Sequence, residues 1–364
     1  METYKKFKPN LIPNSKVTAP IDLESIIGDN VSNYIVSYKK DGCRMEFVDG
    51  KILTRALKPV TSLWVQERFQ KLADKCKEIG IILEGEFFSP ELRFNEIVRY
   101  FKTEDVGSES SIKKLLKLEE SGKLASEWPG RSVEFMATYP ESLKLYPFDL
   151  LVIGNEDISY YDRMEWLFSA FYNDDGLLRE FTDLVEFGPW FNIVKKPDMT
   201  LHIITTFKEL EREYEKALEL GYEGLVIANK NRTYKFNRST ARDNHIFKMK
   251  EDKLQYDGVV LDIIEGTVAR EDAPKTRNEL GRSVTSKLKE DRVESGLASG
   301  ILSEFEGHPI KVSLEGFTHD DLRELLANKE QYIGQWFRYT GMAPVKNVPR
   351  HAHASKSDMW RDEK

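Results

Sequence analysis

The sequence Tyr38-Lys39-Lys40-Asp41-Gly42-Cys43-Arg44 lies between the apolar segment Tyr34-Ile35-Val36 and the alternating segment Met45-Glu46-Phe47-Val48. This order of residues predicts a strand, a tight turn and a second strand. A second lysine and an arginine in the same stretch place positive charge beside Lys39, and cationic neighbours disfavour a protonated amine. Two interpretations follow: Lys39 is a nucleophile, or the turn is a solvated hairpin with a basic tip.

The length and composition are those of a globular protein with a sizeable core. The chain has 364 residues, 40% of them hydrophobic and 32% charged, and this length favours two domains. Its apolar runs, such as Leu150-Leu151-Val152-Ile153, are too short to span a bilayer, and its first residues lack the apolar core of a secretory signal. Cys43 and Cys76 form neither a disulfide framework nor a zinc-binding pattern. We therefore expect a cytoplasmic protein without membrane association.

The charge of the chain is unevenly distributed. The net charge of -7 argues against a protein that coats nucleic acid, because non-specific phosphate binding depends on clustered Lys and Arg. Between Lys230 and Lys253, however, eight basic residues stand against three acidic ones. This basic segment, which includes Lys235 and Arg238, indicates one site for a polyanion, with a solvated surface as the alternative.

Hydrophobic periodicity predicts alternating strands and helices up to about residue 250. We expect an irregular arm over residues 1–33 and helices over residues 61–79, 111–121 and 162–171. A further helix begins at Thr206-Phe207-Lys208-Glu209, which has the pattern of a capping box. The charged residues 251–253 are expected to form a hinge, which divides the chain into domains of residues 1–253 and 254–364.

The second domain is predicted to be a small barrel of the oligonucleotide-binding type, because it combines short strands with one helix over residues 318–326. The expected strands cover residues 257–264, 309–314 and 335–339.

Several predicted strands carry charged residues where a hydrophobic core is expected. Glu86 interrupts the apolar segment 81–88, and Glu223 opens the apolar segment 224–227. Lys248 and Lys250 alternate with apolar residues, so both lie on one face of a strand. A charge inside a strand is costly unless it is paired or binds a ligand, and these charges are therefore expected to converge on one site with Lys39 and Arg44.

At this point the sequence resembles the covalent nucleotidyltransferases, and within them the ATP-dependent DNA ligases. Five motifs occur in the order of that family, and the C-terminal sequence Arg361-Asp362-Glu363-Lys364 resembles a sixth more loosely. The five motifs are Lys39-Lys40-Asp41-Gly42-Cys43-Arg44, Glu84-Gly85-Glu86, Tyr146-Pro147-Phe148-Asp149-Leu150-Leu151, Glu223-Gly224-Leu225-Val226-Ile227 and Lys248-Met249-Lys250.

The resemblance implies an α+β fold, in which an adenylation domain of antiparallel sheets with flanking helices precedes an OB-fold β-barrel. It implies ATP and Mg²⁺ or Mn²⁺ as cofactors. By position, Lys39 would form the phosphoamide with AMP, and Lys248 and Lys250 would neutralise the α-phosphate. Glu86 and Glu223 would contact the ribose or the metal.

The remaining residues that match the family pattern would bind the nucleotide or the nucleic acid. Tyr146 or Phe148 would stack on adenine, and the pattern favours Phe148. In the sixth motif, Arg361 and Lys364 would orient the leaving pyrophosphate, with a frayed charged tail as the alternative. The residues implied at the nucleic acid are Arg44 and Arg55, which would bind its terminal phosphate, together with Lys235 and Arg238.

The resemblance is strongest to the short two-domain ligases of bacteriophages, since the first motif begins at residue 39. It implies a monomer that seals nicks in duplex DNA in a bacterial or phage-infected cytoplasm. Three alternatives remain: an RNA ligase, a capping nucleotidyltransferase, and an inactive nucleic-acid-binding relative. Ala228 departs from the family, which usually has a lysine at this position.

Overall fold

The computed structural model describes residues 7–12, 20–28, 30–192, 203–239, 246–250, 254–277, 283–286, 288–345, 348–357 and 359–361. The chain divides into two compact units. The first contains residues 1–116, 132–251 and 279–281, and the second contains residues 117–131, 252–278 and 282–364. The expected hinge at residues 251–253 lies outside the described residues, and the boundary after residue 253 stays a prediction.

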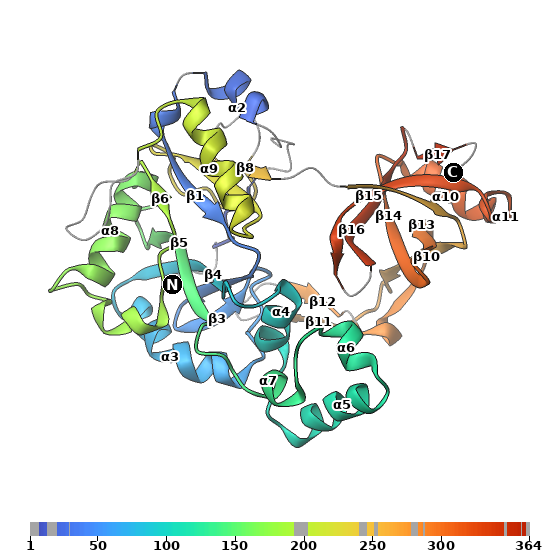
Figure 1. Ribbon diagram of the computed structural model, residues 1–364, viewed down its shortest axis with the longest axis horizontal. Helices are drawn as coiled ribbons and strands as arrows, with labels where there is room; N and C mark the ends of the chain where they lie inside the picture. Colours follow the sequence, from blue (N-terminus) through green and yellow to red (C-terminus); the bar gives the residue numbers. More distant parts are fainter. Residues whose placement is uncertain are drawn as a thin grey trace. The chain divides into compact units, whose positions relative to one another are not determined.

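The first sheet of the first unit is antiparallel and carries Lys39 at a strand end. Its strands in spatial order are β6 (Trp190–Phe191), β1 (Tyr34–Lys39), β7 (Gly224–Asn229) and β8 (Ile246–Lys250). Helices α9 (Phe207–Glu219) and α2 (Pro20–Ile27) lie next to each other, and α9 also packs against β7 (Figure 1). Apolar side chains of these helices and strands form a shared core on one face of the sheet. On the other face, Ile35, Ala228 and Ile246 belong to the core of the second sheet.

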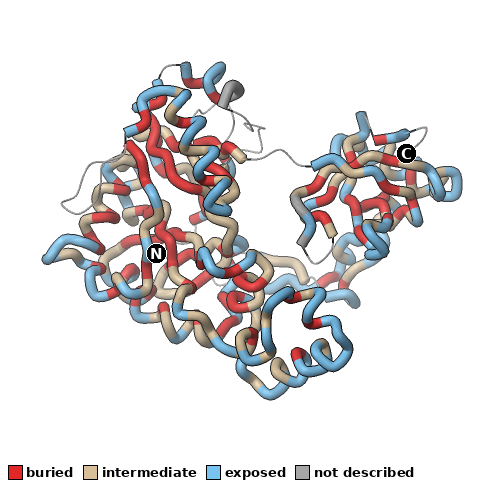
Figure 2. Tube along the Cα trace, in the orientation of Figure 1, coloured by how far each residue is buried: buried red, intermediate tan, exposed pale blue. Residues whose placement is uncertain are grey.

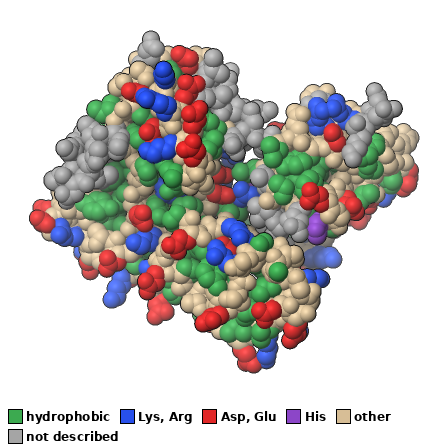
Figure 3. All heavy atoms as spheres, viewed as in Figure 1, with side chains coloured by type: hydrophobic (Ala, Val, Ile, Leu, Met, Phe, Trp, Pro, Cys, Tyr) green, Lys and Arg blue, Asp and Glu red, His purple; other side chains and the backbone are tan. Residues whose placement is uncertain are grey.

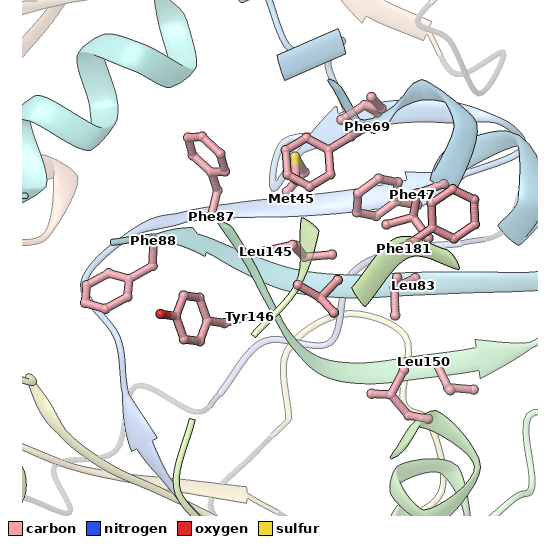
Figure 4. Close-up of a cluster of buried hydrophobic side chains, with 14 of the residues drawn as sticks. Met45, Phe47, Phe69, Leu83, Phe87, Phe88, Leu145, Tyr146, Leu150 and Phe181 are labelled. Carbon is pink, nitrogen blue, oxygen red and sulfur yellow. The ribbon is translucent and has the colours of Figure 1, made fainter. Parts of the chain in front are cut away.

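The second sheet of the first unit is also antiparallel and contains the acidic motif residues of β4. Its strands in spatial order are β3 (Lys51–Thr54), β2 (Cys43–Val48), β4 (Ile81–Phe88) and β5 (Lys144–Val152). Helix α3 (Leu63–Glu78) packs against β2, β3 and β4, and α8 (Tyr160–Tyr172) packs against β5. Figure 4 shows the resulting core, in which Phe47, Phe69 and Phe87 belong to one buried cluster.

The segment between β4 and β5 contains more helix than the sequence predicted. We expected one helix over residues 111–121 and found α5 at Glu109–Glu120, but three other helices were missed. Helix α4 is amphipathic and buries Ile97, Tyr100 and Phe101, whereas α6 and α7 have only five residues each. The missed helices are α4 (Phe94–Lys102), α6 (Lys123–Glu127) and α7 (Val133–Ala137).

Local capping signals set the helix ends that the sequence predicted. The Ser62 side chain accepts a hydrogen bond from the Val65 N–H at the start of α3. At the start of α9, Thr206 and Glu209 form the predicted capping box. The expectation of an irregular arm over residues 1–33 was wrong in part, because α2 and the 3₁₀ turn η1 (Val31–Asn33) occur there. A second 3₁₀ turn, η2, covers Arg179–Leu184.

The second unit has the predicted OB fold. Its main sheet has the order β10-β13-β14-β16-β15-β17, and β9 pairs with β15. Helix α10 (His319–Ala327) contacts β13 and β10 and buries Leu325. The strands are β9 (Leu254–Val259), β10 (Asp262–Ala269), β13 (Arg292–Phe305), β14 (His308–Glu315), β15 (Trp336–Val345), β16 (Val348–Ser355) and β17 (Trp360–Arg361). The remaining elements are the hairpin β11 (Lys275–Arg277) and β12 (Ser283–Thr285), the 3₁₀ turn η4 (Lys289–Asp291) and α11 (Lys329–Tyr332).

Burial follows the strands, and charge is spread over the surface. Buried residues concentrate in the sheets, whereas outer helices such as α5 are largely exposed (Figure 2). On the face of the first unit that Figure 3 presents, acidic and basic side chains are interspersed. Cys43 and Cys76 are buried free thiols, as expected without a disulfide framework. Among the described residues, every helix is too short or too polar to cross a bilayer.

Candidate active site

Lys39 and Glu223 meet where β1 and β7 run side by side. Lys39 is the last residue of β1 and lies opposite Gly224, the first residue of β7. The Glu223 N–H donates a hydrogen bond to the Lys39 carbonyl at 2.9 Å. The two side chains form an ion pair between Lys39 Nζ and Glu223 Oε2. Two predicted site residues that are 184 positions apart are thus brought together by strand pairing.

The charge around Lys39 is the opposite of what the sequence predicted. Burial lowers the pKa of Lys39, but the carboxylates of Glu223, Glu86 and Asp41 act against it, and the pKa is raised above its usual value. The expectation that cationic neighbours disfavour the protonated amine was therefore wrong for Lys39. The amine is held as an ammonium ion, and it must lose a proton before it can act as a nucleophile.

Lys40 has the perturbation that was expected of its neighbour. Its Nζ lies 4.8 Å from the centre of the Tyr146 ring and 5.9 Å from that of Tyr222. Burial lowers the pKa of Lys40 to about 8, although Glu86 and Glu186 raise it. The two lysines of the turn therefore occupy different environments: Lys40 lies near aromatic rings, and Lys39 lies among carboxylates.

Glu86 lies in β4, opposite Arg44 in β2. Its side chain is partly exposed, yet burial raises its pKa to about 7. The negative charge of Glu223 raises the pKa further, whereas the positive charges of Lys39 and Arg44 lower it. A carboxylate with this pKa changes its charge near neutral pH. The change lies next to the amine that would react, which is a feature of functional sites.

Glycines in three motifs allow the backbones to approach closely. A Cβ at Gly42 would lie 2.4 Å from the Phe87 carbonyl oxygen, and one at Gly85 would lie 2.4 Å from the Leu145 side chain. Gly224 has a φ of +130°, and its Cβ would lie 2.1 Å from the Met249 carbonyl oxygen. These contacts leave no room for a side chain, so the glycines hold the neighbouring acidic residues in register.

Lys248 and Lys250 lie on one face of β8, as the alternation predicted. Both are partly exposed, whereas Phe247 and Met249 are buried. Burial and the positive charges of Lys250, Lys39 and Arg238 lower the pKa of Lys248. Cations that repel each other in this way would be stabilised by a bound polyanion such as a triphosphate.

Of the two aromatic candidates, Phe148 is the accessible one. Tyr146 is 4% exposed and packs against Phe88 (Figure 4). The Lys40 ammonium also lies over its ring. Phe148 is partly exposed, and the Arg44 guanidinium carbon lies 5.0 Å from the centre of its ring. Of the two rings, Phe148 is therefore the one that a planar base could reach, whereas Tyr146 is buried.

The family comparison agrees with this geometry. Residues 17–250 match the family model described as ATP dependent DNA ligase domain. The chain belongs to the ATP-dependent DNA ligases. No curated protein matches the chain.

Two solved structures with TM-scores above 0.5 share the fold. A structure named Pmar-Lig_Pre has 16% sequence identity to this chain, with 98% of this chain and 68% of that chain covered and a TM-score of 0.57. A Lig E DNA ligase has 17% sequence identity to this chain and a TM-score of 0.54. The match covers 95% of this chain and 97% of the Lig E chain. The Chlorella virus DNA ligase-adenylate has 18% sequence identity to this chain and a lower TM-score of 0.42. The match covers 97% of this chain and 98% of the viral chain.

Arg44 of this ligase is already engaged by buried carboxylates. Its Nη2 lies 2.6 Å from Glu84 Oε2, and its Nε lies 2.6 Å from Glu46 Oε1. Its Nη1 donates to the Asn10 carbonyl at 2.7 Å. The predicted binding of nucleotide or a terminal phosphate by Arg44 stays a prediction, and it requires these ion pairs to rearrange.

A buried polar cluster next to Arg44 escaped the sequence analysis. Asp149 in β5 pairs with Arg163 at 2.8 Å and with Arg232 at 2.6 Å, and all three are at most 3% exposed. The Tyr234 hydroxyl donates to Glu84 on the same side of the sheet. Asp149 belongs to a quoted motif, but no local pattern marks its two arginines, because residues 83 positions apart meet only in the fold.

The predicted nucleic-acid-binding residues lie at the surface beside this cluster. Arg55 and Arg238 are exposed and Lys235 is partly exposed. Burial lowers the pKa of Arg55, and the charges of Arg44 and Arg238 lower it further, so the three arginines are neighbours. Ala228 is 1% exposed, and its side chain belongs to the core.

The sixth motif is described in part. Arg361 lies in β17 of the second unit, where its Nε is 3.9 Å from Asp257 Oδ1. Lys364 lies outside the described residues. The role of both residues with pyrophosphate stays a prediction.

The acidic residues beside Lys39 have the chemistry that a magnesium ion requires. Within the described ranges, no group of three or more His, Cys, Asp or Glu is arranged to hold a metal by itself. Mg²⁺ is usually bound by one or two carboxylates together with substrate phosphates and water. Glu223 and Glu86 therefore fit such an ion when a nucleotide supplies the other ligands.

Proposed function

We propose that this ligase seals nicks in duplex DNA through a covalent AMP on Lys39. The observation that supports the proposal is the ion pair of Lys39 with Glu223, close to Lys248, whose pKa the charges of Lys39 and Lys250 help to lower. An amine, a carboxylate that binds it and cations that could neutralise phosphates therefore lie near one another.

In the first step, Lys39 loses its proton and attacks the α-phosphorus of ATP. An N–P bond forms, the bond from the α-phosphorus to the bridging oxygen breaks, and pyrophosphate leaves. Glu223 contacts the ammonium form of Lys39, and the proton leaves to solvent when this ion pair is broken. Lys248 and Lys250 stabilise the negative charge that develops on the α-phosphate.

In the second step, an oxygen of the 5′-phosphate attacks the phosphorus of the lysyl-AMP, and the N–P bond breaks. In the third step, the 3′-hydroxyl attacks the activated 5′-phosphate, a phosphodiester bond forms and AMP leaves. The exposed Arg55 and Arg238, with Lys235, would hold the DNA backbone during these steps. Because they contact phosphates, they need not read a base sequence.

Mg²⁺ or Mn²⁺, held by Glu223 and Glu86 and by the nucleotide, would neutralise phosphate charge. We also propose that the ligase acts as a monomer, because one chain supplies the nucleophile, the acids and the cations. Light scattering of the ligase bound to a nicked duplex tests this: one chain per nick is expected, and two chains would contradict it.

The adenylation assay tests the central assignment. ATP labelled at its α-phosphate should place label on the wild-type protein, and peptide mapping should locate it at Lys39. A chase with nicked DNA should release the label as AMP and yield sealed strands. The same chase with nicked RNA and with hybrid duplexes distinguishes a DNA ligase from an RNA ligase, and GTP in place of ATP tests the capping alternative.

A further inference from the structure

A short N-terminal segment, residues 7–12, packs against the chain that precedes β8. Leu11 and Arg238 form a parallel β-bridge, and the Ser239 N–H donates to the Leu11 carbonyl at 2.9 Å. Phe7 is fully buried in a cluster with Tyr234. This N-terminal segment is therefore part of the folded unit and lies over residues 234–239.

Asn10 uses its side chain and its backbone to join this segment to the buried arginines. It is 7% exposed. Its Nδ2 lies within hydrogen-bond distance of three acceptors: Lys235 O at 2.7 Å, Asn237 O at 3.2 Å and Ser239 Oγ at 3.2 Å. Its Oδ1 accepts from Arg232 at 3.4 Å, and its carbonyl accepts from Arg44 at 2.7 Å. One side chain thus contacts two backbone carbonyls and one hydroxyl within residues 235–239.

The segment held by Asn10 carries two cations beside the site. Arg238 Nη1 donates to the Ile12 carbonyl at 2.9 Å, so the N-terminal segment orients the guanidinium directly. The charge of Arg238 also contributes to the lowered pKa of Lys248, which places the two cations close to each other. Lys235 lies in the same segment, and its carbonyl accepts the shortest Asn10 hydrogen bond.

We propose that Asn10 is a positioning residue for DNA binding, which holds Lys235 and Arg238 where they can contact the phosphates of the nicked strand. The inference rests on the proposed function, because it assumes that the two cations bind DNA. It assigns the N-terminal segment a role in the later steps of the reaction, and it leaves the attack of Lys39 on ATP independent of Asn10.

The test compares Asn10→Ala with the wild-type ligase in binding to a nicked duplex over a range of salt concentrations. Loss of one or two phosphate contacts is expected to make the slope of log K against log salt shallower by about 1 to 2. The dissociation constant at low salt should rise about tenfold. Labelling of Lys39 by ATP should remain.

A double-mutant cycle shows whether Asn10 acts through Arg238. If it does, adding Asn10→Ala to Arg238→Ala should change the salt slope less than it does in the wild-type ligase, because one of the two cations is already absent. Ser239→Ala removes the hydroxyl that accepts one hydrogen bond from Asn10. It should make the slope of log K against log salt shallower by a smaller amount. This milder variant keeps the test available if Asn10→Ala does not fold.

Asn192→Ala is the matched control for lost stability. Asn192 is 5% exposed and its Nδ2 also donates to backbone carbonyls, at 2.9 Å to both Tyr34 and Ile204. Within the described residues its hydrogen bonds go to Val31, Tyr34 and Ile204, so its replacement should lower the melting temperature and leave the salt slope unchanged.

Three outcomes would overturn the inference. They are an unchanged slope in Asn10→Ala, a full effect of Asn10→Ala in the Arg238→Ala background, and a slope change of the same size in Asn192→Ala. Failure of the proposed function has a different signature, since the wild-type ligase would then not be labelled by ATP or would not bind the nicked duplex.

Discussion

Lys39 and Glu223 are paired twice, through a backbone hydrogen bond of 2.9 Å between β1 and the start of β7 and through an ion pair of their side chains. The proposed nucleophile is therefore held by a residue that is also proposed to bind the metal. A cation that binds Glu223 would compete with Lys39 for the carboxylate, which would favour the neutral amine. We therefore expect the protonation of Lys39 to change when the substrate binds.

The two lysines of the turn should respond differently to replacement by alanine. Lys39→Ala should abolish labelling by ATP, because it removes the amine that is paired with Glu223. Lys40→Ala should keep the label, and its loss of transition-state stabilisation should not exceed about 2 kcal/mol, the strength of a desolvated cation–π contact. Label on Lys39→Ala, or none on Lys40→Ala despite correct folding, would contradict this assignment.

Adenylation should depend on pH through Glu86. Burial raises its pKa to about 7, so below that pH the carboxyl is increasingly neutral and cannot bind a cation. The rate should therefore rise with pH through about 7. Higher Mg²⁺ concentration should move the inflection to lower pH, because the metal favours the carboxylate. In Glu86→Gln this inflection should be missing; a profile that keeps it and its metal dependence would assign it to another group.

Gly224→Ala should damage both stability and adenylation. The φ of +130° disfavours a side chain by about 1–3 kcal/mol, and the added Cβ would also meet the Met249 carbonyl at 2.1 Å. Strands β7 and β8 would then separate, which displaces Glu223 and Lys250. Gly221→Ala is the control, since Gly221 has a φ of +81° with no atom within 4 Å of the added Cβ. Equal losses in the two variants would exclude the strand contact as the cause.

Asp149→Asn should destabilise the first unit by about 3–5 kcal/mol, because two buried arginines lose their counter-charge. Burial raises the pKa of Asp149, but Arg163 and Arg232 lower it below its usual value overall. The stabilisation is thus present above pH 3.8 and is lost as pH falls through the folded pKa.

Urea titration at several pH values measures this effect. The difference in the free energy of unfolding between wild type and Asp149→Asn should be largest at neutral pH and should become smaller in acid. Asp174→Asn is the control, since Asp174 is 99% exposed in its 2.6 Å pair with Arg179 and should cost less than about 1 kcal/mol. A similarly small loss for Asp149→Asn would show that the buried cluster is not held by charge.

The sequence by itself determined the family and part of the secondary structure, although it missed α2, α4, α6 and α7, and its candidate reacting groups stay predictions. Alternation predicted the shared face of Lys248 and Lys250, and the capping box predicted the start of α9. The five motifs indicated the ligase family before any contact was known, because their residues and their order match the pattern of that family.

Only the tertiary structure decided which charges meet. It placed Lys39 among carboxylates and Lys40 among aromatic rings, although the sequence presents them as neighbours. It also paired Arg44 with Glu46 and Glu84 and brought Asn10 against residues that follow it by more than 220 positions. The electrostatic environment of a side chain depends on its burial and on partners from distant strands. The spacing of residues along the chain predicts neither its burial nor those partners.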